Sequence, residues 1–355
     1  MGALGLLLLC TSATNSKMTT IFIIGDSTAA NKSGIVEGKQ ERGWGMALEC
    51  YFDDNIRVDN HAVIGRSSKS FIDEGRWDKV LERLKPGDYV IIQFGHNDEK
   101  PKADRHTDPG STFDYNLAKF VRETREHGGI PVLMNCVVRR NWGEASPNPS
   151  EGGEPIGTKI DDEALRNTTT SSSPTSERPS DSGTVSPPSE GSGEIPALTL
   201  IDTHGLYRVA PRDVASRMNC HFVDANQITH DLEQGLGTEG SKRLHMWFLP
   251  GTEPSEPKGK QDNTHYNIYG AHVVARLLAD ALCEEIPVLK KYRTEADITV
   301  DTQGRGQFLS LEKAMETVDQ SKPTTIQILG GEWKKPVLQK KSKVEFILRE
   351  GATWK

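Results

Sequence analysis

Two short polar motifs carry the side chains best suited to chemistry. Gly25–Thr28 contains Ser27 and directly follows the apolar run Thr19–Ile24, where a buried strand is expected to end. Asp262–His265 supplies a carboxylate and an imidazole at i, i+3 spacing, which predicts one helical turn with both groups on the same face. A hydroxyl, an imidazole and a carboxylate are the three parts of an activated oxygen nucleophile. The two motifs therefore predict a hydrolase.

Two further segments supply groups that can stabilise the negative oxygen formed when a hydroxyl attacks an ester carbonyl. Gly65 follows the apolar run Val58–Ile64, and a glycine at a strand end lets its backbone N–H approach a ligand closely. Asn97 follows the run Tyr89–Phe94, and its side-chain amide can donate a hydrogen bond. With the N–H of Ser27, these donors predict an oxyanion hole, where losing one donor typically costs about 3 kcal/mol of barrier.

The elements that must position these groups alternate along the chain between apolar runs and amphipathic segments. The runs that predict buried strands are Ile21–Ile24, Val58–Ile64, Tyr89–Phe94, Pro131–Val138 and Phe222–Val223. The segments that predict helices are Met46–Phe52, Trp77–Leu84, Thr112–His127, Pro211–Asn219 and Ala271–Glu285. This alternation predicts an α/β fold with a parallel sheet covered on both faces. Ligands bind such sheets beyond the carboxyl ends of the strands, where Ser27, Gly65 and Asn97 are expected.

The four motifs together resemble the four ordered blocks of the SGNH (GDSL) hydrolase superfamily. The longer sequences around these motifs are similar to those of rhamnogalacturonan acetylesterases, over about residues 19–287. The segments that carry this closer resemblance are Gly25–Ala30, Gly65–Phe71, Val137–Arg140 and Asp262–Asn267. A low-complexity insertion at residues 143–197 departs from the family pattern.

This resemblance implies a flavodoxin-like three-layer α/β/α sandwich with a central parallel sheet. It also implies an enzyme that removes acetyl groups from the galacturonate residues of pectic rhamnogalacturonan, without a metal or cofactor. Carried over position by position, it makes Ser27 the nucleophile, His265 the base and Asp262 the group that orients the base. It makes Gly65 and Asn97 oxyanion donors.

The C-terminal residues resemble a second family. Four segments are similar to the opening of a pectin methylesterase β-helix, namely Asp297–Val300, Gly304–Phe308, Leu311–Val318 and Lys322–Ile328. The segments that hold that family's catalytic residues are missing, so the resemblance implies a short, truncated β-helix-like segment without an active site. Because every proposed catalytic residue precedes it, activity is expected to survive removal of the residues after Pro287.

The domain boundaries follow from composition. Residues 1–17 contain the apolar run Ala3–Cys10 and small residues after it, which predict a signal peptide and a secreted or periplasmic protein. Residues 18–290 form the expected hydrolase domain. Within it, residues 143–197 are rich in Ser, Thr, Pro, Gly and Glu and predict a disordered insertion. Residues 291–355 form the expected C-terminal segment.

The overall composition limits the possible partners. The 43 basic and 50 acidic residues give a net charge of −7 without a Lys/Arg-rich run, which argues against nucleic acid. No apolar stretch approaches the length of a membrane span, and no ligand spacing indicates a structural metal. Beyond Cys10, four cysteines allow three disulfide pairings or none: Cys50, Cys136, Cys220 and Cys283. The oligomeric state is left undecided.

Two alternatives compete with a pectic acetylesterase. One is a related esterase that acts on acetylated xylan or on a small acyl ester. The other is a sugar-binding protein that keeps an inactive site, although the complete set of motifs argues against it. Four basic residues either meet the carboxylates of a polyanionic sugar or are ordinary solvated or paired charges: Arg66, Lys69, Arg139 and Arg140.

Overall fold

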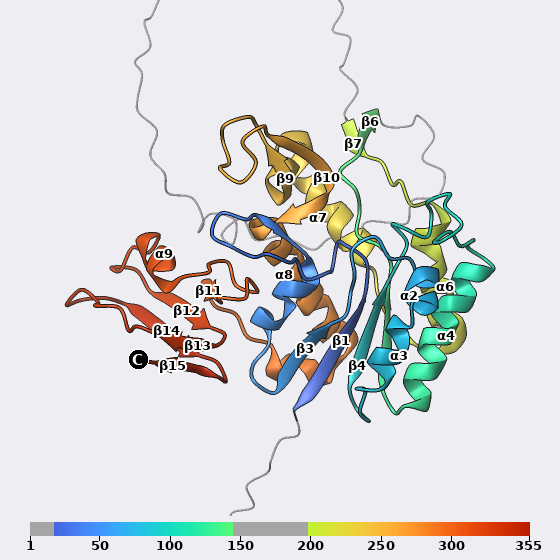
Figure 1. Cartoon of the computed structure of the whole chain (residues 1–355), viewed down its shortest axis with the longest axis horizontal. Coiled ribbons are helices and arrows are strands. Elements are labelled where there is room, and N and C mark those ends of the chain that lie inside the picture. The colour runs from blue at the N-terminus through green and yellow to red at the C-terminus, as the bar shows by residue number, and fades with distance from the viewer. Residues whose placement is uncertain (1–17, 145–197) are drawn as a thin grey trace, which may run out of the picture. The chain divides into compact units, whose positions relative to one another are not determined.

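The computed structural model describes residues 18–144 and 198–355. Its centre is a five-stranded parallel sheet with the order β3-β1-β4-β5-β8. Figure 1 labels the first three of these strands. These strands are β1 (Thr19–Gly25), β3 (Ile56–Asn60), β4 (Tyr89–Gln93), β5 (Ile130–Met134) and β8 (His221–Val223). Numbered along the chain, the order is 2-1-3-4-5, which is the doubly wound order of flavodoxin. The predicted α/β class with a central parallel sheet is confirmed.

Helices cover both faces of this sheet because the side chains of each strand alternate. Ile21 and Ile23 of β1 pack into one apolar cluster, and Phe22 and Ile24 pack into the other. The first face is covered by α1 (Trp44–Ala47), α7 (Ala225–Gly240) and α8 (Ile268–Glu285). The second face is covered by α2 (Ser68–Asp73), α3 (Arg76–Leu81), α4 (Thr112–Glu126) and α6 (Leu206–Met218). The result is three layers, α/β/α.

A small antiparallel sheet lies beside the large one and carries the second polar motif. Its strands, in the order β2-β10-β9, are β2 (Glu41–Arg42), β10 (Lys260–Asn267) and β9 (His245–Phe248). The helical turn predicted for Asp262–His265 is therefore wrong, since these residues lie in β10. In a regular strand, residues three apart point to opposite faces. The register against β9 shifts between Gln261 and Tyr266, and this irregularity lets both side chains serve one site.

Several predicted boundaries also shift. The run Val58–Ile64 is strand only to Asn60, and its remainder is the loop that leads to Gly65. Helix α8 begins before the predicted Ala271, because the side chain of Asn267 caps it by accepting from the N–H of Gly270 at 2.9 Å. The predicted helix Met46–Phe52 is α1 followed by a 3₁₀ turn, η1 (Leu48–Tyr51). Two further 3₁₀ turns are η2 (Ser241–Leu244) and η3 (Pro287–Tyr292).

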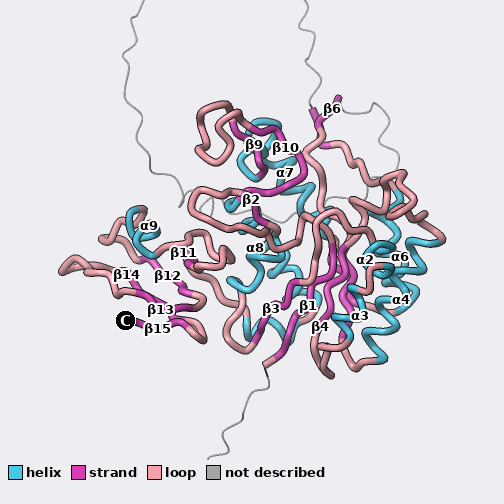
Figure 2. Tube along the Cα trace, viewed as in Figure 1, coloured by secondary structure: helices cyan, strands magenta, loops and turns pink. Residues whose placement is uncertain are grey.

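The C-terminal residues form two short parallel sheets around their own apolar cluster. Figure 2 shows β11 (Ile298–Val300), β12 (Thr324–Ile328) and β14 (Val344–Leu348) side by side. The second sheet pairs β13 (Gly331–Trp333) with β15 (Ala352–Trp354), and α9 (Leu311–Glu316) precedes β12. Parallel strands are what a β-helix-like segment should contain. The assignment to a β-helix stays a prediction.

Residues 143–199 form a separate unit, of which the structure describes only Gly143–Glu144 and Leu198–Thr199. These residues belong to the paired strands β6 (Trp142–Glu144) and β7 (Leu198–Leu200). The predicted signal peptide and nearly all of the predicted insertion lie outside the described residues. The cysteines at positions 50, 136, 220 and 283 carry free thiols. No helix in the described part of the chain is long and apolar enough to cross a membrane.

Candidate active site

Ser27 lies in a tight turn directly after β1. The turn is closed by the carbonyl of Asp26, which accepts from the N–H groups of Ala29 and Ala30. The carboxylate of Asp26 accepts from the N–H and the hydroxyl of Thr28 at 2.9 and 2.8 Å. Burial raises the pKa of Asp26, although these hydrogen bonds act against it. The buried turn leaves Ser27 itself 9% exposed, at the carboxyl end of the sheet.

The structure brings Ser27, His265 and Asp262 into one continuous chain of hydrogen bonds. The Nε2 atom of His265 lies 2.9 Å from the Oγ atom of Ser27. The Nδ1 atom of the same ring lies 2.7 Å from Oδ2 of Asp262. The His265 and Asp262 side chains are 29% and 20% exposed, so the chain of hydrogen bonds is open to a ligand from solvent. This geometry allows a proton to leave the hydroxyl for a ring whose other nitrogen faces a carboxylate.

Both oxygens of the Asp262 carboxylate are used. Oδ2 faces the ring of His265, and Oδ1 accepts from the backbone N–H groups of Thr264 and His265 at 2.9 and 3.0 Å. Partial burial acts to raise the pKa of Asp262, but the hydrogen bonds from His265 outweigh it and hold that pKa well below its usual range. Asp262 is therefore ionised at neutral pH, and it fixes both the ring and the irregular backbone of β10.

Gly65 and Asn97 lie at the ends of the strands on either side of β1. The N–H of Val63 donates to the carbonyl of Gly25 at 3.0 Å, which ties the Gly65 loop to the end of β1. Asn97 donates from Nδ2 to the carbonyl of Arg66 at 3.1 Å and accepts from Nζ of Lys100 at 2.9 Å. These contacts fix the amide with its nitrogen toward the Gly65 loop.

Comparison with known proteins shows which family the chain belongs to. Residues 23–273 match the model of the GDSL-like lipase/acylhydrolase family. The chain is 31% identical over 268 residues to the rhamnogalacturonan acetylesterase RhgT of Bacillus subtilis, a match that covers 76% of this chain and 91% of that one. The chain belongs to the GDSL-like lipase/acylhydrolase family. The acylhydrolase is thus a serine ester hydrolase, as predicted.

Two further matches are shorter or more distant. A rhamnogalacturonan acetylesterase of Emericella nidulans is 41% identical over 81 residues, which are 22% of this acylhydrolase and 28% of that protein. The crystal structure of YxiM from Bacillus subtilis superposes with a TM-score of 0.51 at 21% identity. That superposition covers 75% of this chain and 56% of the other, and it supports the fold alone.

Asp98 connects three segments of the acylhydrolase around the site. Its buried carboxyl accepts from the N–H of Ser68 at 3.0 Å and from the hydroxyl of Thr107 at 2.9 Å. Burial raises the pKa of Asp98 to about 7, although these hydrogen bonds oppose the shift. Asp98 therefore joins the end of β4 to the start of α2 and to the loop before α4.

The four basic residues considered for substrate binding all have partners within the chain. Arg66 pairs with Glu74 at 3.1 Å. Lys69 pairs with Asp73, and Arg139 with Glu99. Arg140 donates to Oδ1 of Asn263 at 3.2 Å and to Ser241 at 3.0 Å. Arg140 thus holds the segment between Asp262 and His265, and the expectation of ordinary paired charges describes these residues best.

The rings of His96 and His204 lie together. Their ring centroids are 4.5 Å apart, and the Nδ1 atom of His204 lies 2.9 Å from a carboxylate oxygen of Glu99. Burial lowers the pKa of His96 well below its usual value, so its ring is neutral.

Sequence reasoning missed one polar group in direct contact with the Ser27 backbone, the ammonium of Lys32. No motif indicates it, because its role depends on a contact formed only in the folded chain.

Proposed function

We propose that this protein is a carbohydrate O-acetylesterase that removes acetyl groups from pectic rhamnogalacturonan. The observation that carries the proposal is the hydrogen-bonded chain Ser27–His265–Asp262, assembled from the two ends of the domain. Relatives named as rhamnogalacturonan acetylesterases support the substrate class. The predicted signal peptide suits a substrate outside the cell, and export is part of this proposal.

The proposed reaction begins when Ser27 Oγ attacks the acetyl carbonyl carbon while His265 Nε2 takes its proton. The carbonyl π electrons move to oxygen, and the N–H groups of Ser27 and Gly65 with Nδ2 of Asn97 stabilise that oxyanion. Collapse of this intermediate breaks the bond to the sugar oxygen, which leaves with the proton from His265. The product of this half-reaction is acetyl-Ser27.

The second half-reaction repeats these steps with water. His265 takes a proton from the water as its oxygen attacks the acetyl carbon, and the same donors hold the oxyanion. Collapse then returns the proton to Ser27 Oγ and releases acetate. Asp262 orients the ring and stabilises its protonated form in both halves. None of these steps requires a metal ion or a cofactor.

Acetate release from polymers tests the proposed substrate. The wild-type chain is incubated with acetylated rhamnogalacturonan and, separately, with acetylated xylan, and the Ser27→Ala variant serves as the control. We expect faster release from rhamnogalacturonan and none above background from the variant. Faster release from xylan would contradict the substrate, and polymer binding without release by the wild type would indicate the sugar-binding alternative.

A further inference from the structure

A buried lysine holds the backbone of Ser27. The Nζ atom of Lys32 donates to the carbonyl oxygen of Ser27 at 2.6 Å, and its side chain is only 3% exposed. Lysine is almost never buried without a charged partner. That partner is Glu41, whose Oε1 lies 2.9 Å from Nζ. Partial burial acts to raise the pKa of Glu41, but the Lys32 ammonium outweighs it, and Glu41 remains ionised.

Glu41 also lies beside the strand that carries His265. It belongs to β2, in which Glu41 pairs with Asn267 and Arg42 pairs with Tyr266, the residue directly after His265. Glu41 additionally faces Nζ of Lys260, the first residue of β10, at 3.6 Å. One short strand thus contacts the backbone of Ser27 through Lys32 and the backbone of β10 through its own pairing.

The residues after β2 pack directly on the Ser27 turn. The N–H of Trp44 donates to the carbonyl of Thr28 at 2.9 Å. A Cβ atom at Gly43 would lie 2.3 Å from the carbonyl oxygen of Ala30, which no side chain tolerates. The position of β2 is therefore tightly coupled to that of the turn.

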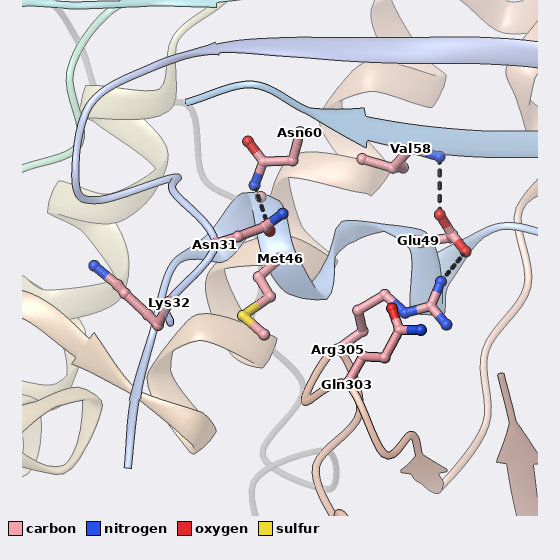
Figure 3. A pocket seen from close by; sticks show the side chains of 9 residues that line it. Asn31, Lys32, Met46, Glu49, Val58, Asn60, Gln303 and Arg305 are labelled. Carbon is pink, nitrogen blue, oxygen red and sulfur yellow. Dashed lines mark hydrogen bonds and ion pairs between the residues drawn. The ribbon is translucent and has the colours of Figure 1, made fainter. Parts of the chain in front are cut away.

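The C-terminal segment in turn anchors β2. Arg42 is 2% exposed, and its Nε donates to the carbonyl of Gly304 at 3.0 Å. Figure 3 shows Arg305 from the same turn in an ion pair with Glu49, at 2.7 Å. Arg305, Glu49 and Lys32 line one pocket of about 250 Å³, also visible in Figure 3. Nothing in the proposed acyl transfer uses these contacts.

We propose that Lys32 and Glu41 are positioning residues that align Ser27 with His265, and that the C-terminal segment secures them through the Arg42–Gly304 contact. The inference rests on the proposed roles of Ser27 and His265. Lys32 fixes the peptide that follows the nucleophile, and β2 fixes the strand that carries the base. A shift of either one lengthens the 2.9 Å contact between Oγ and Nε2.

The first test replaces the buried pair. Lys32→Met and Glu41→Gln are assayed with 4-nitrophenyl acetate, whose turnover does not depend on polymer binding. We expect kcat per folded molecule to fall about 10- to 100-fold, with KM within about twofold of wild type. The matched control is the exposed pair Lys313–Glu316, replaced as Lys313→Met and Glu316→Gln, for which we expect no change in kcat.

Two results would overturn the role of the pair. One is wild-type kcat in the folded Lys32→Met and Glu41→Gln variants. The other is a loss of total activity that merely follows the folded fraction measured by circular dichroism. If the wild type hydrolyses 4-nitrophenyl acetate but not rhamnogalacturonan, only the proposed substrate fails. If the wild type hydrolyses neither substrate, the proposed roles of Ser27 and His265 fail, and this inference fails with them.

The second test separates the effect of the Arg42–Gly304 contact from that of ordinary backbone strain at a glycine with positive φ. Gly304 has φ +81°, and an added Cβ would lie 2.7 Å from the side chain of Ile35 and 3.3 Å from Nε of Arg42. Gly351 has φ +83° and open space around the same position. We expect Gly304→Ala to lower kcat about 3- to 10-fold, while Gly351→Ala stays within about twofold of wild type. Equal kcat values for the two variants would overturn the role of the C-terminal segment.

Discussion

Asp262 contacts both the ring and the backbone of His265. One of its oxygens faces the ring of His265, and the other binds the backbone that carries this ring. The carboxylate therefore selects the ring tautomer with the proton on Nδ1, which leaves Nε2 free to accept a proton from Ser27. An asparagine at position 262 would keep the shape of the side chain and lose its negative charge.

Asp262→Asn should consequently lower kcat about 10³- to 10⁴-fold, because the amide favours the wrong tautomer and no longer stabilises the protonated ring. KM for a small ester should change little. Steady-state kinetics with 4-nitrophenyl acetate measure both constants, and near-ultraviolet circular dichroism checks the fold. A variant with more than a tenth of wild-type kcat would show that Asp262 does not orient the base.

Asn97→Ala should lower kcat about 10²- to 10³-fold, since one proposed oxyanion donor is lost. The effect belongs in kcat because the donor acts on the oxyanion more than on the neutral carbonyl. The same assay gives the split between kcat and KM. A rise in KM at constant kcat would instead place Asn97 in ground-state binding.

Asp98 fixes how the end of β4 meets the start of α2. It is fully buried, and burial raises its pKa to about 7. In the unfolded chain the same carboxyl ionises near pH 4. Folding therefore takes up a proton between these values, and the contribution of Asp98 to stability is complete below pH 4 and is lost as pH rises through 7.

The Asp98→Asn variant should lack this pH dependence. Between pH 4.5 and 6.5, Asp98 contributes a fall in the free energy of unfolding of about 1.4 kcal/mol per pH unit. The slope of the variant should differ from that of the wild type by this amount. Urea unfolding at several pH values measures both slopes, and parallel curves would contradict the assigned pKa.

Some elements could be predicted from sequence and others could not. The strands β1 and β4 are continuous apolar runs buried on both faces, which makes them visible without any partner. Strand β10 has no such pattern, because its polar residues are held by pairing with β9 and β2 and by the carboxylate of Asp262. The i, i+3 spacing of Asp262 and His265 therefore indicated a helical turn, whereas tertiary pairing produced an irregular strand.

The C-terminal segment packs against the α/β/α domain that carries Ser27 and His265, called the catalytic part below. Leu329 belongs to the apolar cluster on the α8 face of the central sheet. Gln327 donates to the carbonyl of Cys50 at 3.1 Å, and Arg349 pairs with Asp54 at 2.6 Å. Sequence motifs indicated Ser27 and His265, whose side chains the structure brings into contact, but they gave no sign of Lys32 or of these contacts, which join residues distant in the chain.

Removal of residues 294–355 should therefore destabilise the catalytic part, contrary to what the positions of the motifs alone suggest. Loss of the Leu329 side chain alone should cost about 2–5 kcal/mol, and the buried Arg42 would lose its Gly304 acceptor. Urea unfolding of the full and shortened chains measures the difference. Equal free energies of unfolding would show that the segment folds independently of the catalytic part.

Covalent trapping with a phosphonate reports directly on the nucleophile. The protein is treated with a fluorophosphonate ester, digested and analysed by mass spectrometry. We expect one adduct per chain, on the peptide that contains Ser27, with none on Ser27→Ala and much slower labelling of His265→Ala. Labelling of another serine, or equal labelling rates in wild type and His265→Ala, would contradict a nucleophile at Ser27 activated by His265.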